Sequence, residues 1–251
     1  MTNNIIKLSR FAVEMSLQCE RCFVLQYKHK ISLRSFPFTL NLAVDDLVKN
    51  EFDYYRDKGL PHPIFEQYAI DAVPFKHSKM DEWRNNFKGA YYTDIFGAYK
   101  FGGAVDDLWQ KKDGELVIAD TKATSKKNFN WQETYERYDY PKAYKRQLEM
   151  YKWVFIKLGF KVSNKGYLLY FNGIKDNQFF NNSLQFEQYL IELELNDLWV
   201  ESAILNAVAL LKSKDLPKPS KSCDKCNYLK ERWYLSQSNV EEFLDRQNTF
   251  K

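Results

Sequence analysis

A short apolar run that ends in two opposite charges constrains the fold of this chain more than any other stretch. Residues 116–119 are apolar, and Asp120, Thr121 and Lys122 follow them directly. Successive side chains of a strand point to opposite faces of a sheet, so Asp120 and Lys122 share one face with Ile118. A charge at the end of a buried face is costly unless it is paired or binds a metal. The stretch therefore predicts a buried strand whose charged end is a candidate metal site.

A partner strand is predicted just before it. Residues 98–110 and 115–123 are separated by a short segment that contains Asp-Gly, which is typical of a hairpin turn. The hairpin brings Asp106 near Asp120, and adjacent carboxylates repel each other unless a cation lies between them. Oxygen ligands suit a hard ion such as Mg²⁺ or Mn²⁺. The alternative is an ordinary ion pair at the end of a surface strand.

The rest of the chain predicts further helices and strands. Residues 64–97 are ambiguous, apart from a short helix within residues 80–89, and Asn196 is expected to cap the last helix. The simplest fold that accounts for these elements is one α/β domain over residues 1–251, with a mixed central sheet flanked by helices. The periodicity favours helices over residues 5–30, 41–58, 140–159 and 197–213, and strands over residues 164–172 and 184–194.

The composition is that of a globular chain with a sizeable core. Of the 251 residues, 45% are hydrophobic, and 9 Gly and 7 Pro argue against a long disordered linker. The net charge of +4, with scattered Lys and Arg, is weak evidence for a polyanionic partner. No signal peptide and no apolar stretch long enough to span a membrane is visible, which favours a cytoplasmic protein with no membrane partner.

Three short motifs follow one another in the central part of the chain. Gly103-x-x-Asp106 is followed by Asp120-x-Lys122, and then by Gln147 and Tyr151 in the segment RQLEMY. The last two residues are four positions apart and share one face of a helix. In this order the motifs resemble the PD-(D/E)XK nuclease superfamily, in particular its RecB-like branch. The resemblance covers about residues 19–226 and implies a restriction-endonuclease-like core at about residues 98–172.

The resemblance also implies an activity. The chain would be a metal-dependent DNA nuclease, acting as an exonuclease or an end- or flap-processing enzyme on single strands. Mg²⁺ or Mn²⁺ would be bound by Asp106, Asp120 and the backbone carbonyl of Thr121. The implied partners are DNA and a helicase or another repair or CRISPR protein.

Further roles follow from the same resemblance. Lys122 would help to activate water, Gln147 would brace the active site, and Tyr151 would lie along the nucleic-acid strand. The catalytic set is therefore Asp106, Asp120, Lys122, Gln147 and Tyr151.

The chain departs from this family on the helix before the hairpin. RecB-like nucleases usually carry a metal-binding His there, and the helix expected at residues 41–58 has none. Glu51 is the predicted substitute, with Asp45 or Asp46, one or two turns earlier, as alternatives. The missing His favours the alternative function, a non-catalytic nucleic-acid-binding module of a repair, recombination or CRISPR assembly.

All four cysteines occur in C-x-x-C pairs, Cys19 with Cys22 and Cys223 with Cys226. Four thiolates suit zinc or an iron–sulfur cluster, and a pair near each end would join the N-terminal helix to the C-terminal segment. The family resemblance implies a [4Fe–4S] cluster held by one N-terminal and three C-terminal cysteines. The two-plus-two arrangement departs from that pattern, so a cluster, Zn²⁺ and no metal all stay open.

Basic and aromatic residues follow the strand that carries the charges. Lys126 and Lys127 lie close to Phe129 and Trp131, and positive charge with stacking surface suits single-stranded nucleic acid. The alternative is a loop whose aromatic side chains turn inward. Arg21 is a further candidate for a phosphate contact.

Overall fold

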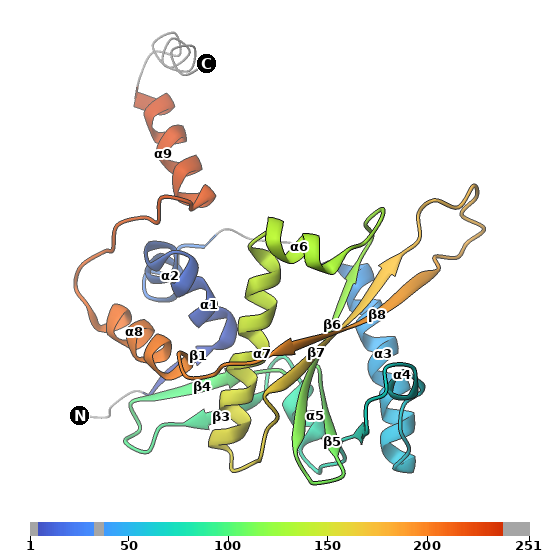
Figure 1. Cartoon of the computed structure of the whole chain (residues 1–251). Coiled ribbons are helices and arrows are strands. Elements are labelled where there is room, and N and C mark those ends of the chain that lie inside the picture. The colour runs from blue at the N-terminus through green and yellow to red at the C-terminus, as the bar shows by residue number, and fades with distance from the viewer. Residues whose placement is uncertain (1–4, 33–37, 238–251) are drawn as a thin grey trace. The chain divides into compact units, whose positions relative to one another are not determined.

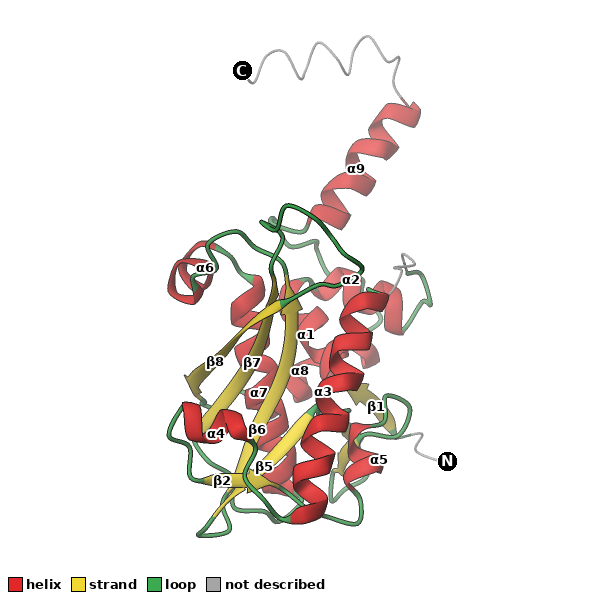
Figure 2. Cartoon of the chain, turned by 90° about the vertical axis from the view of Figure 1, so that its right-hand side faces the viewer, coloured by secondary structure: helices red, strands yellow, loops and turns green. Residues whose placement is uncertain are grey.

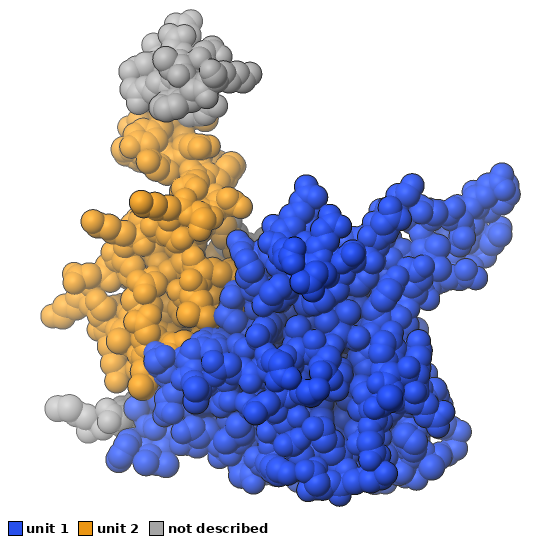
Figure 3. All heavy atoms as spheres, in the orientation of Figure 1, with its two compact units in different colours: residues 1–10, 35–202 blue, residues 11–34, 203–251 orange. Residues whose placement is uncertain are grey.

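The computed structural model describes residues 5–32 and 38–237 (Figure 1). The chain divides into two compact units, which Figure 3 shows in different colours. The first unit comprises residues 1–10 and 35–202, and the second comprises residues 11–34 and 203–251. Both sheets belong to the first unit. A single domain over the whole chain stays a prediction.

A five-stranded sheet forms the centre of the first unit. Its strand order is β2-β5-β6-β7-β8. β6 and β7 are parallel, and the other neighbours are antiparallel. The predicted α/β fold with a mixed sheet and flanking helices is therefore confirmed. The strands are β2 (Ala72–Pro74), β5 (Asp107–Lys111), β6 (Leu116–Thr124), β7 (Lys165–Gly173) and β8 (Phe186–Glu194).

Helices pack on both faces of this sheet (Figure 2). On one face, α3 (Thr39–Lys58) and α4 (Pro63–Gln67) bury Phe52 and Phe65 against Trp109 of β5. On the other face lies α7 (Tyr140–Lys157). Because strand side chains alternate, the odd-numbered residues of β6 face α3 and the even-numbered residues face α7.

A second, three-stranded sheet has the order β1-β4-β3. Its strands are β1 (Ile6–Ser9), β4 (Tyr99–Gly103) and β3 (Ala90–Thr93). The predicted strand over 98–110 is therefore wrong, since it forms two strands, β4 and β5, in different sheets. Glycine allows β3 to pair closely with β4, since a Cβ on Gly102 would lie 1.9 Å from the carbonyl oxygen of Ala90.

The predicted helix over residues 5–30 is only partly confirmed. The segment begins with β1, which pairs in parallel with β4, and continues as α1 (Arg10–Gln18) and α2 (Glu20–Tyr27). Cys19 separates the two helices in an extended conformation, with φ −160° and ψ 107°. A strand and a break within one apolar segment were not visible from helical periodicity alone.

The remaining helices partly match the sequence expectations. α5 (Met80–Arg84) lies within the expected short helix. α8 (Val200–Lys212) begins later than predicted, since the Asn196 side chain accepts a hydrogen bond from the Leu198 N–H outside the helix. α6 (Trp131–Arg137) and α9 (Asp224–Gln237) were not predicted. Across the described residues, every helix is too short or too polar to cross a membrane.

A buried ion-pair network joins α3 to the start of β5. Arg56 is 5% exposed and donates hydrogen bonds to Asp107 Oδ1 at 2.5 Å and to the Phe75 carbonyl at 2.6 Å. Its Nε also donates to Asp53 at 3.0 Å. Burial raises the pKa of Asp107, and the nearby positive charge of Arg56 offsets part of this rise. The network holds Asp107 on the α3 side of the strand that follows Asp106.

We expect Arg56→Met to lower the free energy of unfolding by about 3 kcal/mol or more, because Asp107 would remain buried without its partner. Lys76→Met is the matched control, since it breaks an exposed pair with Asp57 and should change stability by less than about 1 kcal/mol. Urea unfolding measures both. Equal effects of the two substitutions would contradict a structural role for the buried network.

Candidate active site

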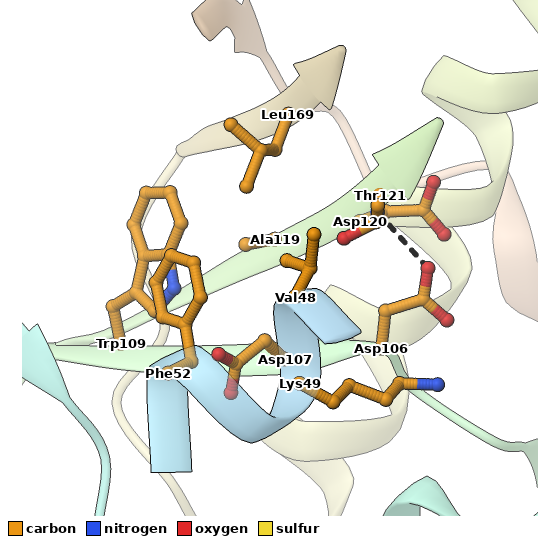
Figure 4. A pocket seen from close by; sticks show the side chains of 10 residues that line it. All are labelled: Val48, Lys49, Phe52, Asp106, Asp107, Trp109, Ala119, Asp120, Thr121 and Leu169. Carbon is orange, nitrogen blue, oxygen red and sulfur yellow. Dashed lines mark hydrogen bonds between the residues drawn. The ribbon is translucent and has the colours of Figure 1, made fainter. Parts of the chain in front are cut away.

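The carboxylates of Asp106 and Asp120 lie close to Thr121 in the middle of β6, where its pairing with β5 ends (Figure 4). Asp120 is 2% exposed within the strand. Asp106 lies in the connection between β4 and β5, and its Oδ2 accepts a hydrogen bond from the Thr121 N–H at 3.0 Å. These residues line one part of a cavity of about 10 Å³, and apolar residues such as Phe52 and Trp109 line another part. This volume is close to the smallest space that holds one water molecule.

The two carboxylates interact unfavourably in the absence of a cation. Burial, followed by the nearby charge of Asp106, raises the pKa of Asp120 to about 7. With the Thr121 carbonyl, the donor set consists of oxygen atoms, which suits Mg²⁺ or Mn²⁺. A divalent cation bound here would offset the repulsion, so the residues present fit the implied metal.

Lys122 supplies a fixed positive charge beside this pair. Its ammonium group forms an ion pair with Asp120 Oδ2 and lies 4.8 Å from the centroid of the Tyr144 ring. Burial alone would lower the pKa of Lys122, but the carboxylates of Asp120 and Asp106 outweigh it and raise the pKa. Lys122 is therefore held as a cation on the α7 side of β6.

Two side chains of α7 donate hydrogen bonds that hold Asp120 and the segment before Asp106 in place. Gln147 Nε2 donates to Asp120 Oδ1 at 2.5 Å, which fixes the orientation of the carboxylate. Tyr151 donates to the carbonyl oxygen of Ala104, two residues before Asp106. Tyr151 is only 2% exposed, and a Cβ on Gly103 would approach its hydroxyl to 3.2 Å. The structure thus places Tyr151 behind the active site, which differs from the expected contact with a nucleic-acid strand.

α3 brings a further carboxylate, that of Asp45, close to Asp106. Asp45 Oδ2 accepts a hydrogen bond from Lys49 at 2.5 Å, and Lys49 lines the cavity. Burial, followed by the nearby charge of Asp106, raises the pKa of Asp45. In the described part of the chain, Asp45 Oδ1 is buried without a hydrogen-bond partner. Asp45 is therefore the acidic residue of α3 that faces the candidate site.

Glu51 lies outside this group. Its side chain is 58% exposed, and its Oε1 lies 3.2 Å from Nε2 of His62. His62 is buried and stacks on Phe52 with ring centroids 4.1 Å apart. Helical phase could have identified Asp45, since it precedes the buried Phe52 by seven positions and shares its helix face, whereas Glu51 is adjacent to Phe52 and points about 100° away from it.

The loop after β6 turns its aromatic side chains inward. Phe129 packs between Tyr170 and Tyr189, with ring centroids 5.1 Å and 4.9 Å away. Lys126 donates a hydrogen bond to the Tyr140 hydroxyl at 2.5 Å, while Lys127 is exposed. Trp131 also packs on Tyr170. The inward alternative therefore describes these aromatics, and the nucleic-acid roles of Lys126 and Lys127 stay predictions.

The four cysteines converge within the second unit. Their Sγ atoms all lie within 4.8 Å of one another. The Sγ atom of Cys22 is 3.5 Å from those of Cys223 and Cys226, and Cys19 is 3.9 Å from Cys226. A tetrahedral zinc ion with bonds of about 2.3 Å places its sulfur ligands about 3.8 Å apart. The observed separations are close to this spacing, so the four thiols could hold a metal.

Hydrogen bonds prepare one of these thiols for ligation. Burial would raise the pKa of Cys19, but hydrogen bonds from the backbone N–H groups of Ser220 and Cys22 outweigh it and lower the pKa to about 7. Arg21, a predicted phosphate contact, also belongs to the second unit. There its Nη1 donates to the Pro217 carbonyl at 3.5 Å.

Comparisons with known proteins agree with this geometry. The sequence matches the PD-(D/E)XK nuclease superfamily over residues 26–230, and the chain therefore belongs to this family. The resemblance of the chain to the RecB-like branch is consistent with this family assignment. A comparison with curated proteins found no match.

Solved structures were also compared. The one described as "Crystal structure of SSO0001" is similar with a TM-score of 0.43 and 15% sequence identity, over 84% of this chain and 79% of that chain. Similarity at this level adds nothing to the family assignment.

Proposed function

We propose that this chain is a metal-dependent DNA nuclease that hydrolyses phosphodiester bonds. The observation that carries the proposal is the meeting of Asp106, Asp120 and Lys122 in one buried site, in a member of a nuclease superfamily. By resemblance to the RecB-like branch, we propose single strands or DNA ends as substrates, processed as an exonuclease or a flap-type nuclease.

Mg²⁺ or Mn²⁺ would be held by Asp106, Asp120 and the Thr121 carbonyl. Such a cation supplies an activated water and offsets the negative charge of the phosphate. Lys122 stands beside Asp120 as a cation and can stabilise charge that develops on the phosphate oxygens. Gln147 keeps one oxygen of Asp120 occupied, so that the other stays directed toward Lys122.

Tyr151 acts through another residue. Burial raises the pKa of its hydroxyl, which therefore remains a hydrogen-bond donor to the Ala104 carbonyl. This bond anchors the segment that leads to Asp106. Tyr151 is proposed as a positioning residue rather than one that touches the substrate.

Asp45 is proposed as a third carboxylate for the metal, on the helix where RecB-like nucleases usually carry a His. The buried and unpaired Oδ1 and the electrostatic influence of Asp106 support this role. Glu51 fits it less well because its carboxylate is exposed and lies beside His62.

The Cys19, Cys22, Cys223 and Cys226 thiols are proposed to bind one zinc ion. The Sγ separations support this choice over the [4Fe–4S] cluster that the family resemblance implies. Within the second unit, such an ion would link α2 to α9, whose cysteines are about two hundred residues apart in the sequence. Closing so long a loop is where a metal contributes most to stability.

We expect Asp120→Asn and Lys122→Ala each to reduce cleavage by at least about a hundredfold, because the first removes a metal ligand and the second removes a positive charge beside the reacting phosphate. The assay uses end-labelled single-stranded and duplex DNA with Mg²⁺, with Mn²⁺ and with a chelator. Lys165→Ala is the control, since it removes an exposed lysine of β7 that pairs with Glu192. Variants as active as wild type would refute the proposal, and a folded wild-type protein that binds DNA without cleaving it would support a non-catalytic binding module.

We expect Asp45→Asn to raise the Mg²⁺ concentration needed for half-maximal cleavage by about tenfold or more, because a metal ligand is lost. Glu51→Gln should leave that concentration unchanged. Lys49→Met removes the ion-pair partner of Asp45 but keeps the Asp45 carboxylate. It therefore separates a direct role of Asp45 at the metal from a role that acts through this ion pair. A shift in Glu51→Gln but not in Asp45→Asn would assign the ligand to Glu51 instead.

We expect protein purified without oxygen to contain one zinc ion per chain by elemental analysis, and Cys22→Ser to lose it. Ser222→Ala, next to Cys223, is the matched control and should retain the ion. Unfolding of the Cys22 variant should begin at a lower temperature, because metal binding to such sites stabilises the folded state. Iron with acid-labile sulfide in place of zinc would show that the site holds a cluster.

A further inference from the structure

The three-stranded sheet has one buried face and one charged face. Phe101 and Tyr92 pack against Trp153 of α7, with ring centroids 5.7 Å and 5.4 Å away. Because side chains alternate along a strand, Lys100 and Tyr91 point to the opposite face. That face does not contribute to the candidate active site.

Two lysines lie side by side on the charged face. Lys7 of β1 is directly opposite Lys100 of β4 in the parallel register. Their ammonium groups lie 4.6 Å and 5.3 Å from the centroid of the Tyr91 ring. Like charges opposite each other destabilise a sheet. The electron-rich ring offsets part of this cost, and an anionic ligand would offset more of it.

The charged face lines a cavity of about 680 Å³. This volume lies within the range of roughly 300–1,000 Å³ that is typical of ligand sites. Residues 77–89 contribute Lys79 and Lys88, and Glu82 is the single carboxylate among the described residues that line it. Within the described ranges, none of the four lysines forms an ion pair. Such an excess of positive charge attracts a polyanion.

Aromatic side chains accompany the lysines. Phe87 lines the cavity and is 92% exposed. The Asn85 side chain accepts hydrogen bonds from the backbone N–H groups of Phe87 and Lys88, at 2.8 Å and 3.1 Å. Trp83 and His77, which also line the cavity, stack with centroids 4.4 Å apart. An exposed ring among lysines suits the stacking of an unpaired base.

The cavity wall is attached to the segment that carries Asp106. The Val105 N–H, one residue before Asp106, donates to the Trp83 carbonyl at 3.1 Å. A Cβ on Gly89 would lie 2.6 Å from the carbonyl carbon of Gly103, so the end of this wall runs directly against β4. The cavity wall and the segment that carries Asp106 are therefore joined by direct backbone contacts.

We propose that this lysine-lined cavity binds single-stranded nucleic acid as a second binding site, with Lys7 and Lys100 on phosphates and Phe87 stacked on a base. Four lysines favour a phosphate backbone, and the exposed ring favours unpaired bases over a duplex. The inference extends the proposed nuclease function, but it is tested by binding in a chelator, so that cleavage plays no part.

The test is the binding of a fluorescent oligothymidine to the full chain across a range of salt concentrations. The double variant Lys7→Ala/Lys100→Ala should bind more weakly. The negative slope of the logarithm of the binding constant against the logarithm of the salt concentration should become shallower by about 1.4, as for the loss of two phosphate contacts on a single strand. Phe87→Ala should weaken binding by about fivefold or more with the salt slope unchanged, because stacking carries no charge.

The matched control is Lys112→Ala/Lys165→Ala, which removes the same charge from exposed ion pairs of the five-stranded sheet. It should retain wild-type affinity and slope. Equal losses of affinity in both double variants would show that the effect comes from net charge alone, and this would overturn the proposal. Tighter binding of labelled polyglutamate than of the oligonucleotide would also overturn it, in favour of an acidic protein partner. Absence of cleavage by wild type would leave these binding outcomes intact.

Discussion

The rest of this site depends on the contacts that stabilise the buried carboxylate of Asp120. It lies on a strand that is covered on both faces, where an isolated charge would be costly. Lys122 and Gln147 each occupy one of its oxygens, and Asp106 approaches from the neighbouring connection through the Thr121 N–H. Each of these partners is fixed by a different element, so the geometry of the site requires both sheets and α7.

The same strand was the most predictable part of the chain. The apolar run before Asp120 and the Asp-Gly turn are local signals, and they predict β6 and the turn that joins it to the preceding strand. The motif carrying Gln147 and Tyr151 was likewise readable from helical spacing. These features were found because they depend on residues that are close in the sequence.

The features that were missed depend on contacts distant in the sequence. Residues 98–110 form two strands because β4 pairs with β1 and β3 while β5 pairs with β6, and no local pattern shows this choice of partners. The contact between Glu51 and His62, which stacks on Phe52, joins α3 to the segment that follows it and is likewise not visible in a local pattern. Tyr151 was expected at the surface, but Gly103 leaves room for its hydroxyl beneath β4.

Manganese binding, measured by electron paramagnetic resonance at neutral pH, tests the central claim most directly, because it reports the metal site without requiring the right substrate. We predict one tightly bound Mn²⁺ at this site in wild type and its loss in Asp106→Asn with the fold retained. Folded protein that binds no Mn²⁺ at millimolar concentration, or an Asp106→Asn variant that binds it as well as wild type, would contradict the assignment of these carboxylates to a catalytic metal.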